Sequence, residues 1–187
     1  MENPITLRPP LQEADVRNLK AGERVLVSGI IYTARDQVHK LLFEKMPEEL
    51  KKPLHGSIIY HCGPIVKDGK ILSAGPTTSI REEPYEAELI RRYTLRAIIG
   101  KGGMGEKTLR ALIDNGAVYL ATTGGAGALL SESVKRIKSV RFEEFGPPEA
   151  MYELVVENLL AIVAMDSHGK SLYDAVLRES QRNLEKL

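Results

Sequence analysis

The first half of the chain alternates runs rich in β-branched residues with segments whose apolar residues recur three or four positions apart. Residues 23–34 and 57–66 are runs of the first kind and predict strands. Residues 70–78 predict a third strand, joined to the second by a KDGK turn. Residues 35–46 have the helical spacing and predict an amphipathic helix. The charged stretch 47–56 is expected to be a connector.

The second half of the chain predicts two consecutive units of strand and helix. Its pattern predicts, in order, a helix at 81–93, a strand at 96–100, a helix at 106–115, a strand at 118–122, a glycine-rich loop and a helix at 129–137. This order is most economically folded with parallel strands and helical connections. Residues 151–166 alternate and then run apolar, so two strands or one long bent strand both fit.

The whole pattern predicts one α/β domain spanning residues 1–187, with mixed sheets and flanking helices. Within it, residues 1–20 are expected to form an N-terminal segment and residues 171–187 a charged terminal helix. A chain of 187 residues can bury roughly 70% of the surface that its unfolded form exposes, which is enough for a substantial core.

Composition narrows the classes of partner and location. The formal net charge is +1 and the basic residues are spread along the chain, which argues against nucleic acid as the main partner. No apolar run reaches the ~18 residues that a membrane helix needs, and the polar N-terminal residues predict no secretory signal, so a cytoplasmic protein is expected. The single cysteine, Cys62, allows neither an internal disulfide nor a cysteine-based metal cluster, and a half-buried thiol at a strand end is expected.

A glycine-rich loop between the strand at 96–100 and the following helix has the G-x-G-x-x-G spacing of a dinucleotide site. The next strand, however, ends in ATTGG, without the acidic residue that would hold a ribose. A P-loop also fails, because Glu106 separates the glycines from Lys107 and puts a negative charge where phosphate would bind. The loop is better interpreted as a tight turn that presents Lys101 to an anion. A plain turn with a solvated lysine is the structural alternative.

Three predicted junctions between a strand and a helix each carry one cation: Arg35, Arg81 and Lys101. Arg81 belongs to a G-P-T-T-x-x-R motif in which the hydroxyls of Thr77 and Thr78 precede it by one turn. Guanidinium groups bind carboxylates in a bidentate way, so three cations beside hydroxyls suit a small dicarboxylate if the junctions converge. The alternatives are surface arginines and threonines that only cap a turn.

Four motifs together resemble a known family: R-D-x-x-H, G-P-T-T-x-x-R, I-I-G-K-G-G and Y-L-A-T-T-G-G-A-G-A. From about Ile5 to Asp174 the chain resembles the β subunit of two-subunit, iron–sulfur-dependent class I fumarases and tartrate dehydratases, a region that forms the C-terminal domain of single-chain members. The resemblance implies a swivelling β/β/α fold. It also implies a hydro-lyase that reversibly adds water to fumarate to give (S)-malate, with L(+)-tartrate dehydration as the alternative. A non-enzymatic anion- or nucleotide-binding module is the alternative from another class.

The resemblance also implies roles for individual residues and for a partner. Arg35, Arg81 and Lys101 would bind the substrate carboxylates, with Thr77 beside them and Thr78 as the candidate general base. The cofactor would be a four-iron, four-sulfur cluster held by three cysteines of an α subunit, not by this chain. A dimer of heterodimers is the expected assembly.

Three features depart from the family pattern or receive no clear role from it. Residues 102–104 are Gly-Gly-Met where some single-chain members have a polar turn, although Lys101 itself is in place. His39 matches the histidine of the R-D-x-x-H segment, but at four residues from Arg35 local packing explains it equally well. No role is predicted for the remaining histidines, His55, His61 and His168.

Overall fold

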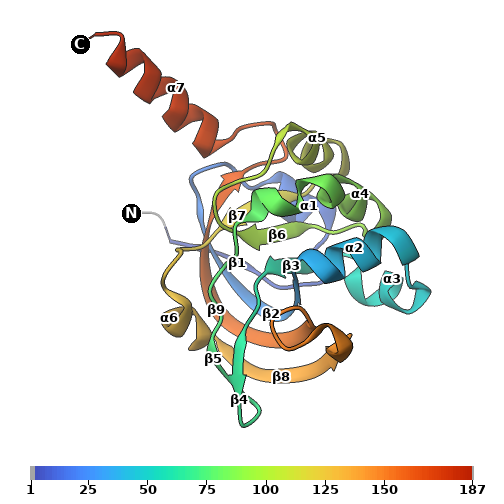
Figure 1. Cartoon of the computed structure of the whole chain (residues 1–187). Helices are drawn as coiled ribbons and strands as arrows, with labels where there is room; N and C mark the ends of the chain where they lie inside the picture. The colour runs from blue at the N-terminus through green and yellow to red at the C-terminus, as the bar shows by residue number, and fades with distance from the viewer. Residues whose placement is uncertain (1–2, 187) are drawn as a thin grey trace.

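The computed structural model describes residues 3–186, so residues 1, 2 and 187 of the predicted domain and of its terminal segments lie outside the description. One large sheet organises the chain (Figure 1). Its order is β1 (Ile5–Leu7), β2 (Arg24–Ala34), β3 (Ile58–His61), β6 (Ala97–Gly100), β7 (Val118–Ala121), β9 (Met151–Met165) and β8 (Val134–Arg141). Because β9 pairs with β2 as well as with β7, the strands β2, β3, β6, β7 and β9 close into a small barrel-like sheet. The molecule is therefore a mixed α/β fold, as predicted.

Side chains of the central parallel strands alternate between two cores. Ile58 and Tyr60 of β3 point into the barrel, whereas Ile59 faces the helical layer, and β6 and β7 repeat this alternation. The helical layer consists of α2 (Asp36–Lys45), α3 (Glu48–Leu54), α4 (Glu83–Tyr93) and α5 (Glu106–Asn115). Since both faces are covered, the carboxyl edge of these strands is the part of the sheet left open for a site.

The remaining elements lie around this centre. They are α1 (Glu13–Arg17), the hairpin of β4 (Ile65–Lys67) and β5 (Lys70–Ser73), the 3-10 helix η1 (Ser79–Glu82), α6 (Gly127–Ser131), the 3-10 helix η2 (Glu143–Phe145) and α7 (Leu172–Leu184). Helix α7 projects away from the body, as Figure 1 shows, and starts one residue later than predicted because Ser171 is its N-cap. Within residues 3–186, no helix is long and apolar enough to cross a membrane.

The predicted helix at 129–137 is only partly correct, because residues 129–131 belong to helix α6 but residues 134–137 begin strand β8. Val134, Ile137 and Val140 are spaced by three, which imitates a helical period. In the structure these side chains pack against the barrel core because two register shifts, between Val134 and Arg136 and between Ile137 and Ser139, each insert an extra residue. Two β-bulges thus turn a period of two into a period of three.

Other sequence predictions need smaller corrections. The connector at 47–56 contains α3, whose Leu50 and Leu54 are spaced by four and fully buried. The strand predicted at 57–66 divides into β3, in the large sheet, and β4, in the separate hairpin. Of the two alternatives for 151–166, one long bent strand is confirmed, with the bend at Asn158, whose φ is +54°. The parallel pairing of β6 and β7 is also confirmed.

Candidate functional site

The predicted site residues meet at the carboxyl edge of the parallel strands. Arg35 directly follows β2, and Lys101 directly follows β6. The segment carrying Thr77 and Thr78 lies between β3 and β6: Thr77 N–H donates to the His61 carbonyl at 2.7 Å, and Thr78 pairs with Lys101 in a parallel β-bridge. The convergence that the sequence could only assume is therefore present in the structure.

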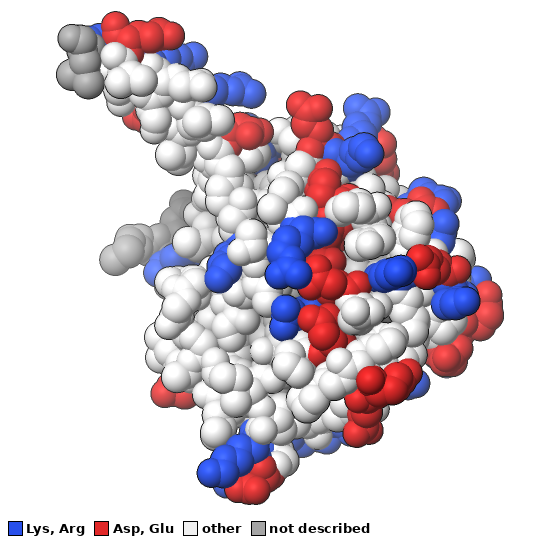
Figure 2. Space-filling view, in the orientation of Figure 1, with Lys and Arg blue, Asp and Glu red and all other residues white. Residues whose placement is uncertain are grey.

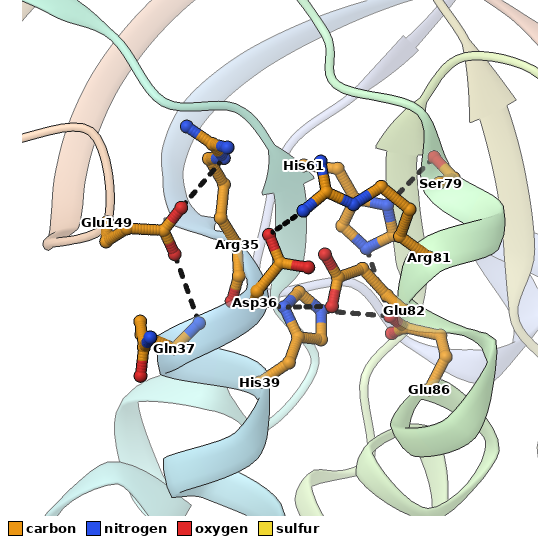
Figure 3. Close-up of polar contacts among 10 residues, drawn as sticks. All are labelled: Arg35, Asp36, Gln37, His39, His61, Ser79, Arg81, Glu82, Glu86 and Glu149. Atoms are coloured by element: carbon orange, nitrogen blue, oxygen red, sulfur yellow. Dashed lines mark hydrogen bonds and ion pairs between the residues drawn. The ribbon is translucent and has the colours of Figure 1, made fainter.

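Both arginines are held by carboxylates of this chain, as Figure 3 shows. Arg81 donates to Asp36 across 2.7 Å, and both side chains are substantially exposed, 55% and 37%. The Nε of Arg35 lies 3.2 Å from Glu149, an ion pair by distance but without the geometry of a hydrogen bond. The other oxygen of Glu149 accepts the backbone N–H of Gln37, at the start of α2. Each guanidinium is thus pre-oriented but retains donors for a ligand.

The two threonines differ in their surroundings. Thr78 is exposed, next to Gly102 of the glycine loop. The hydroxyl oxygen of Thr77 is buried and has no hydrogen-bond partner. Buried hydroxyls in native proteins are nearly always bonded, so this oxygen is placed to receive a ligand or a water molecule. The resemblance assigns the role of base to Thr78, whereas the buried, unpartnered hydroxyl belongs to Thr77.

Lys101 lies against the second glycine-rich loop, residues 122–128. A Cβ added at Gly124 would lie 3.1 Å from the lysine Cδ and 3.6 Å from its Nζ. The hydroxyl of Thr122, at the start of this loop, is also buried without a partner. Its contact with Lys101 makes this loop a close-approach turn beside the site rather than a plain connection.

The N-terminus of α5, where a nucleotide phosphate would bind, is already filled. One carboxylate oxygen of Glu83 accepts the backbone N–H of Gly105 at 2.8 Å, and the other accepts that of Thr108 at 3.1 Å. The Thr108 hydroxyl donates to the same carboxylate at 2.7 Å. Glu83 thereby provides the anion that this helix end favours. This contact counts against the nucleotide-binding alternative.

A buried polar network that sequence reasoning missed lies beneath the site. His39 Nε2 and His61 Nε2 both lie 3.0 Å from the same oxygen of Glu86, and all three side chains are fully buried (Figure 3). The other ring nitrogen of His61 is 2.8 Å from Ser79 Oγ. The only signal in the sequence was the histidine of R-D-x-x-H, since nothing local links Glu86 to either histidine.

The pKa values in this network move in opposite directions. Burial opposes ionisation of Glu86, but its hydrogen bonds to the two histidines prevail and lower its pKa to about 2. Burial also disfavours the His39 cation, yet Glu86 raises the pKa of His39 to about 9. For His61 burial prevails and lowers the pKa. Glu82, on the adjacent turn, has its pKa raised to about 7, mainly by burial.

The group of side chains in residues 3–186 that lies close enough together to hold a metal ion is already engaged within the chain. The ligand atoms of His39, His61 and Glu86 lie within 4.8 Å of one another, but the two Nε2 atoms are already bonded to the Glu86 carboxylate. Cys62 is fully buried rather than half-buried as expected, and burial raises its pKa to about 12. This chain therefore does not offer the thiolates that an iron–sulfur cluster requires.

The charge distribution shows where the site faces. In Figure 2, Lys and Arg side chains gather near the centre of the face, with Asp and Glu side chains beside them. A broad area without charged side chains adjoins them, on the side of α6 and the β4–β5 hairpin. Three large apolar side chains of α6 and the β4–β5 hairpin are exposed: Ile65, Leu72 and Leu129.

Fold and site together define an α/β domain that presents three cations and two hydroxyls at one edge of parallel strands. Residues 1–176 match the family model described as Fumarase C-terminus. The chain belongs to this family, which confirms the resemblance predicted from the four motifs.

Three relatives show how the chain compares with whole proteins. It is 47% identical to a putative fumarate hydratase class I of Geobacillus stearothermophilus, over 98% of this chain but only 35% of that protein. It is 46% identical to a putative L(+)-tartrate dehydratase subunit beta of Methanocaldococcus jannaschii, over 95% of each chain. It is 34% identical to the L(+)-tartrate dehydratase subunit beta of Escherichia coli strain K12, over 89% of this chain and 85% of that one. The chain thus spans about a third of the first relative and most of the other two.

Proposed function

We propose that this chain is the β subunit of a two-subunit iron–sulfur hydro-lyase that reversibly hydrates fumarate to (S)-malate in the cytoplasm. The observation that carries the proposal is the meeting of Arg35, Arg81 and Lys101 with two threonine hydroxyls at one sheet edge. The relative named fumarate hydratase supports this substrate. L(+)-tartrate dehydration is the second candidate, because the relatives of matching length carry that name.

The three cations are proposed to hold the two carboxylates of the substrate. Arg81 can exchange its half-exposed contact with Asp36 for a bidentate contact to a substrate carboxylate. Arg35, oriented by Glu149, offers its remaining guanidinium donors, and Lys101 adds a point charge beside the loop at 122–128. Fixing both ends of a four-carbon dicarboxylate aligns its central bond with the threonine pair.

Thr78 is the proposed general base, as the sequence resemblance implies, with Thr77 as the second candidate. A threonine hydroxyl is a weak base and needs a neighbouring charge to take up a proton from a carbon centre. Lys101 pairs with Thr78 through the backbone and supplies a positive charge close by. The buried, unpartnered hydroxyl of Thr77 is the observation in favour of the alternative.

The iron–sulfur cluster is assigned to a partner α subunit, because the donors of this chain do not fit it. The uncharged surface beside the cations, with exposed Leu72 and Leu129, is the proposed docking face for that subunit. Docking there would close the site over the arginines. A dimer of heterodimers and the swivelling β/β/α class of fold are proposed on the same family resemblance.

Co-expression under anaerobic conditions with a three-cysteine α subunit tests the proposal. The purified complex is expected to consume fumarate, followed by its ultraviolet absorbance, while the isolated chain is inactive because half of the site is missing. Parallel kinetics with L(+)-tartrate decide between the two substrates. A complex with full cluster occupancy and no hydratase activity on either substrate would contradict the proposal. Tight binding of NAD or ATP to the isolated chain in calorimetry would instead favour the nucleotide module.

A further inference from the structure

The buried network has one arm whose proton positions follow from geometry. His39 Nδ1 lies 3.0 Å from the backbone carbonyl of Arg35, and a carbonyl only accepts hydrogen bonds. His39 Nε2 lies 3.0 Å from Glu86, whose carboxylate also accepts when ionised. Both ring nitrogens must therefore carry a proton, so His39 is an imidazolium paired with a buried carboxylate.

The second arm has an equally defined order. The Tyr119 hydroxyl donates to Ser79 Oγ at 2.8 Å, which leaves the Ser79 hydroxyl proton to donate to His61 Nδ1, also at 2.8 Å. With Nδ1 accepting, His61 is neutral and donates from Nε2 to Glu86 at 3.0 Å. The buried charges then balance, with one cation on His39 and one anion on Glu86.

The network reaches every segment that carries a predicted substrate contact. Its first arm ends on the backbone of Arg35, at the start of α2. Its second arm ends on Ser79, which begins the turn carrying Arg81 and whose N–H donates to the Lys101 carbonyl at 3.0 Å. One carboxylate thus joins elements that are far apart in sequence.

The glycine at the end of strand β6, Gly100, leaves room for this network because it has no side chain. A Cβ added at Gly100 would lie 1.9 Å from Ser79 Oγ and 3.0 Å from the Tyr119 hydroxyl, so a side chain there would displace the second arm. The first glycine of the G-x-G-x-x-G spacing is therefore explained by the buried hydroxyls behind the loop. It is not explained by a ligand in front of the loop.

We propose that Glu86 is a positioning residue whose ionised carboxylate, shared between a His39 cation and a neutral His61, sets the relative placement of Arg35, Arg81 and Lys101. Its catalytic consequence rests on the function proposed above. Other charged groups border the network: Glu82 lies 3.5 Å from His39, and Asp36 and Arg81 act on Glu82 in turn. The arrangement of protons itself is a property of this chain alone.

Nitrogen NMR of the histidine rings in the purified wild-type chain tests the proton arrangement without any activity. At pH 7.5 we expect one ring protonated on both nitrogens and assigned to His39 by its loss in His39→Gln. We expect His61, assigned by His61→Gln, to be protonated on Nε2 alone. A neutral His39, or a ring nitrogen bound to metal, would overturn the proposal. Because no partner subunit is involved, this result stands whether or not the proposed reaction is found.

Kinetics of the reconstituted complex test the positioning. Glu86→Gln should lower kcat/KM about 100-fold, as misplaced binding groups do, with a raised KM because the anchors move. Ser79→Ala removes only the hydroxyl that links His61 to the segment bonded to Lys101. It should lower kcat/KM about tenfold. Tyr93→Phe is the matched control, since it removes another buried hydrogen bond of α4, to the Leu42 carbonyl, far from the cations.

The outcomes separate the two proposals. An inactive wild-type complex means that the proposed function has failed, while the NMR result still decides the proton order. If the wild-type complex is active, kinetic constants of Glu86→Gln and Ser79→Ala that match those of Tyr93→Phe would show that the network only stabilises the fold. Should Glu86→Gln fail to fold, Ser79→Ala carries the kinetic test alone, because it leaves the buried ion pair intact.

Discussion

The charged residues of the site form two layers that behave differently, a buried lower layer and a solvent-exposed upper layer. In the lower layer, Glu86 and His39 are fully buried and paired with each other, although the second carboxylate oxygen of Glu86, Oε1, has no hydrogen-bond partner. In the upper layer, the side chains of Arg81 and Asp36 remain 55% and 37% exposed although they are paired. An exposed pair contributes about 0–1 kcal/mol and is screened by salt, so it can be exchanged for a ligand at little cost. A buried pair cannot be opened without leaving an unpaired charge.

This difference indicates what each layer is for. Burying an ion pair is often no more stabilising than an apolar pair of the same volume, so stability alone is a weak reason for the lower layer. What the lower layer does provide is a fixed geometry between Arg35, Ser79 and Lys101. The upper layer provides groups that can leave their present partners and bind an anion.

The largest effect is expected from the threonine pair, where the two layers meet. Removal of a general base typically costs 10²–10⁴-fold in rate, so Thr78→Val should lower kcat by about that range if the proposal is right. With Thr78 as the base, Thr77→Val should lower kcat about tenfold or less. Valine matches the shape of threonine, so both complexes should assemble. Measured in parallel, a larger loss in Thr77→Val would move the role of base to the buried hydroxyl.

The next largest effect is expected from the exposed arginine. Arg81→Met should lower kcat/KM about 100-fold, because loss of a charged contact to a desolvated carboxylate costs about 2–5 kcal/mol. Lys101→Met should behave similarly. In contrast, Arg81→Met should leave the free energy of unfolding nearly unchanged, because the exposed ion pair of Arg81 with Asp36 contributes little to it. Kinetic constants for Arg81→Met equal to those of the wild type would show that Arg81 is not a carboxylate anchor.

Local sequence patterns were sufficient for the parts of the fold and site that depend on neighbouring residues. The helix α5 has the predicted bounds, and Arg35, Arg81 and Lys101 were predicted as site residues because each belongs to a short motif near a predicted junction between a strand and a helix. The first half of strand β8, residues 134–137, was mistaken for helix because bulges changed its period, and these bulges arise in its pairing with strand β9.

The buried layer could not be predicted for the same physical reason. Glu86 meets His39 and His61 across 47 and 25 residues of chain, and no periodic pattern connects such distant positions. The capping of α5 by Glu83 is another contact of this kind, across 22 and 25 residues. Sequence reasoning therefore predicted the groups that are proposed to face a ligand and missed the buried groups beneath them.

The remaining expected effect is on stability rather than on catalysis and concerns Glu82, which lies between the layers. Its folded-state pKa is about 7 against an ordinary 4.5, so between these values the folded chain binds more protons than the unfolded chain. Its contribution to stability is complete below pH 4.5, falls by at most about 1.4 kcal/mol per pH unit, and is lost above about pH 7. Glu82→Gln, which stays neutral, should remove this loss.

Urea unfolding at several pH values between 5 and 8 measures the effect. Relative to the wild type, Glu82→Gln should become progressively more stable as the pH rises, whereas Glu132→Gln, which removes an exposed carboxyl, is the control for charge alone. The contribution of His39 to the free energy of unfolding is present below pH 6.5 and is lost towards pH 9. This contribution declines in both proteins, so it does not create the difference in stability between the wild type and Glu82→Gln. Parallel stability curves for Glu82→Gln and the wild type would mean that Glu82 is already ionised in the fold, held by the His39 cation 3.5 Å away, and so belongs to the buried layer.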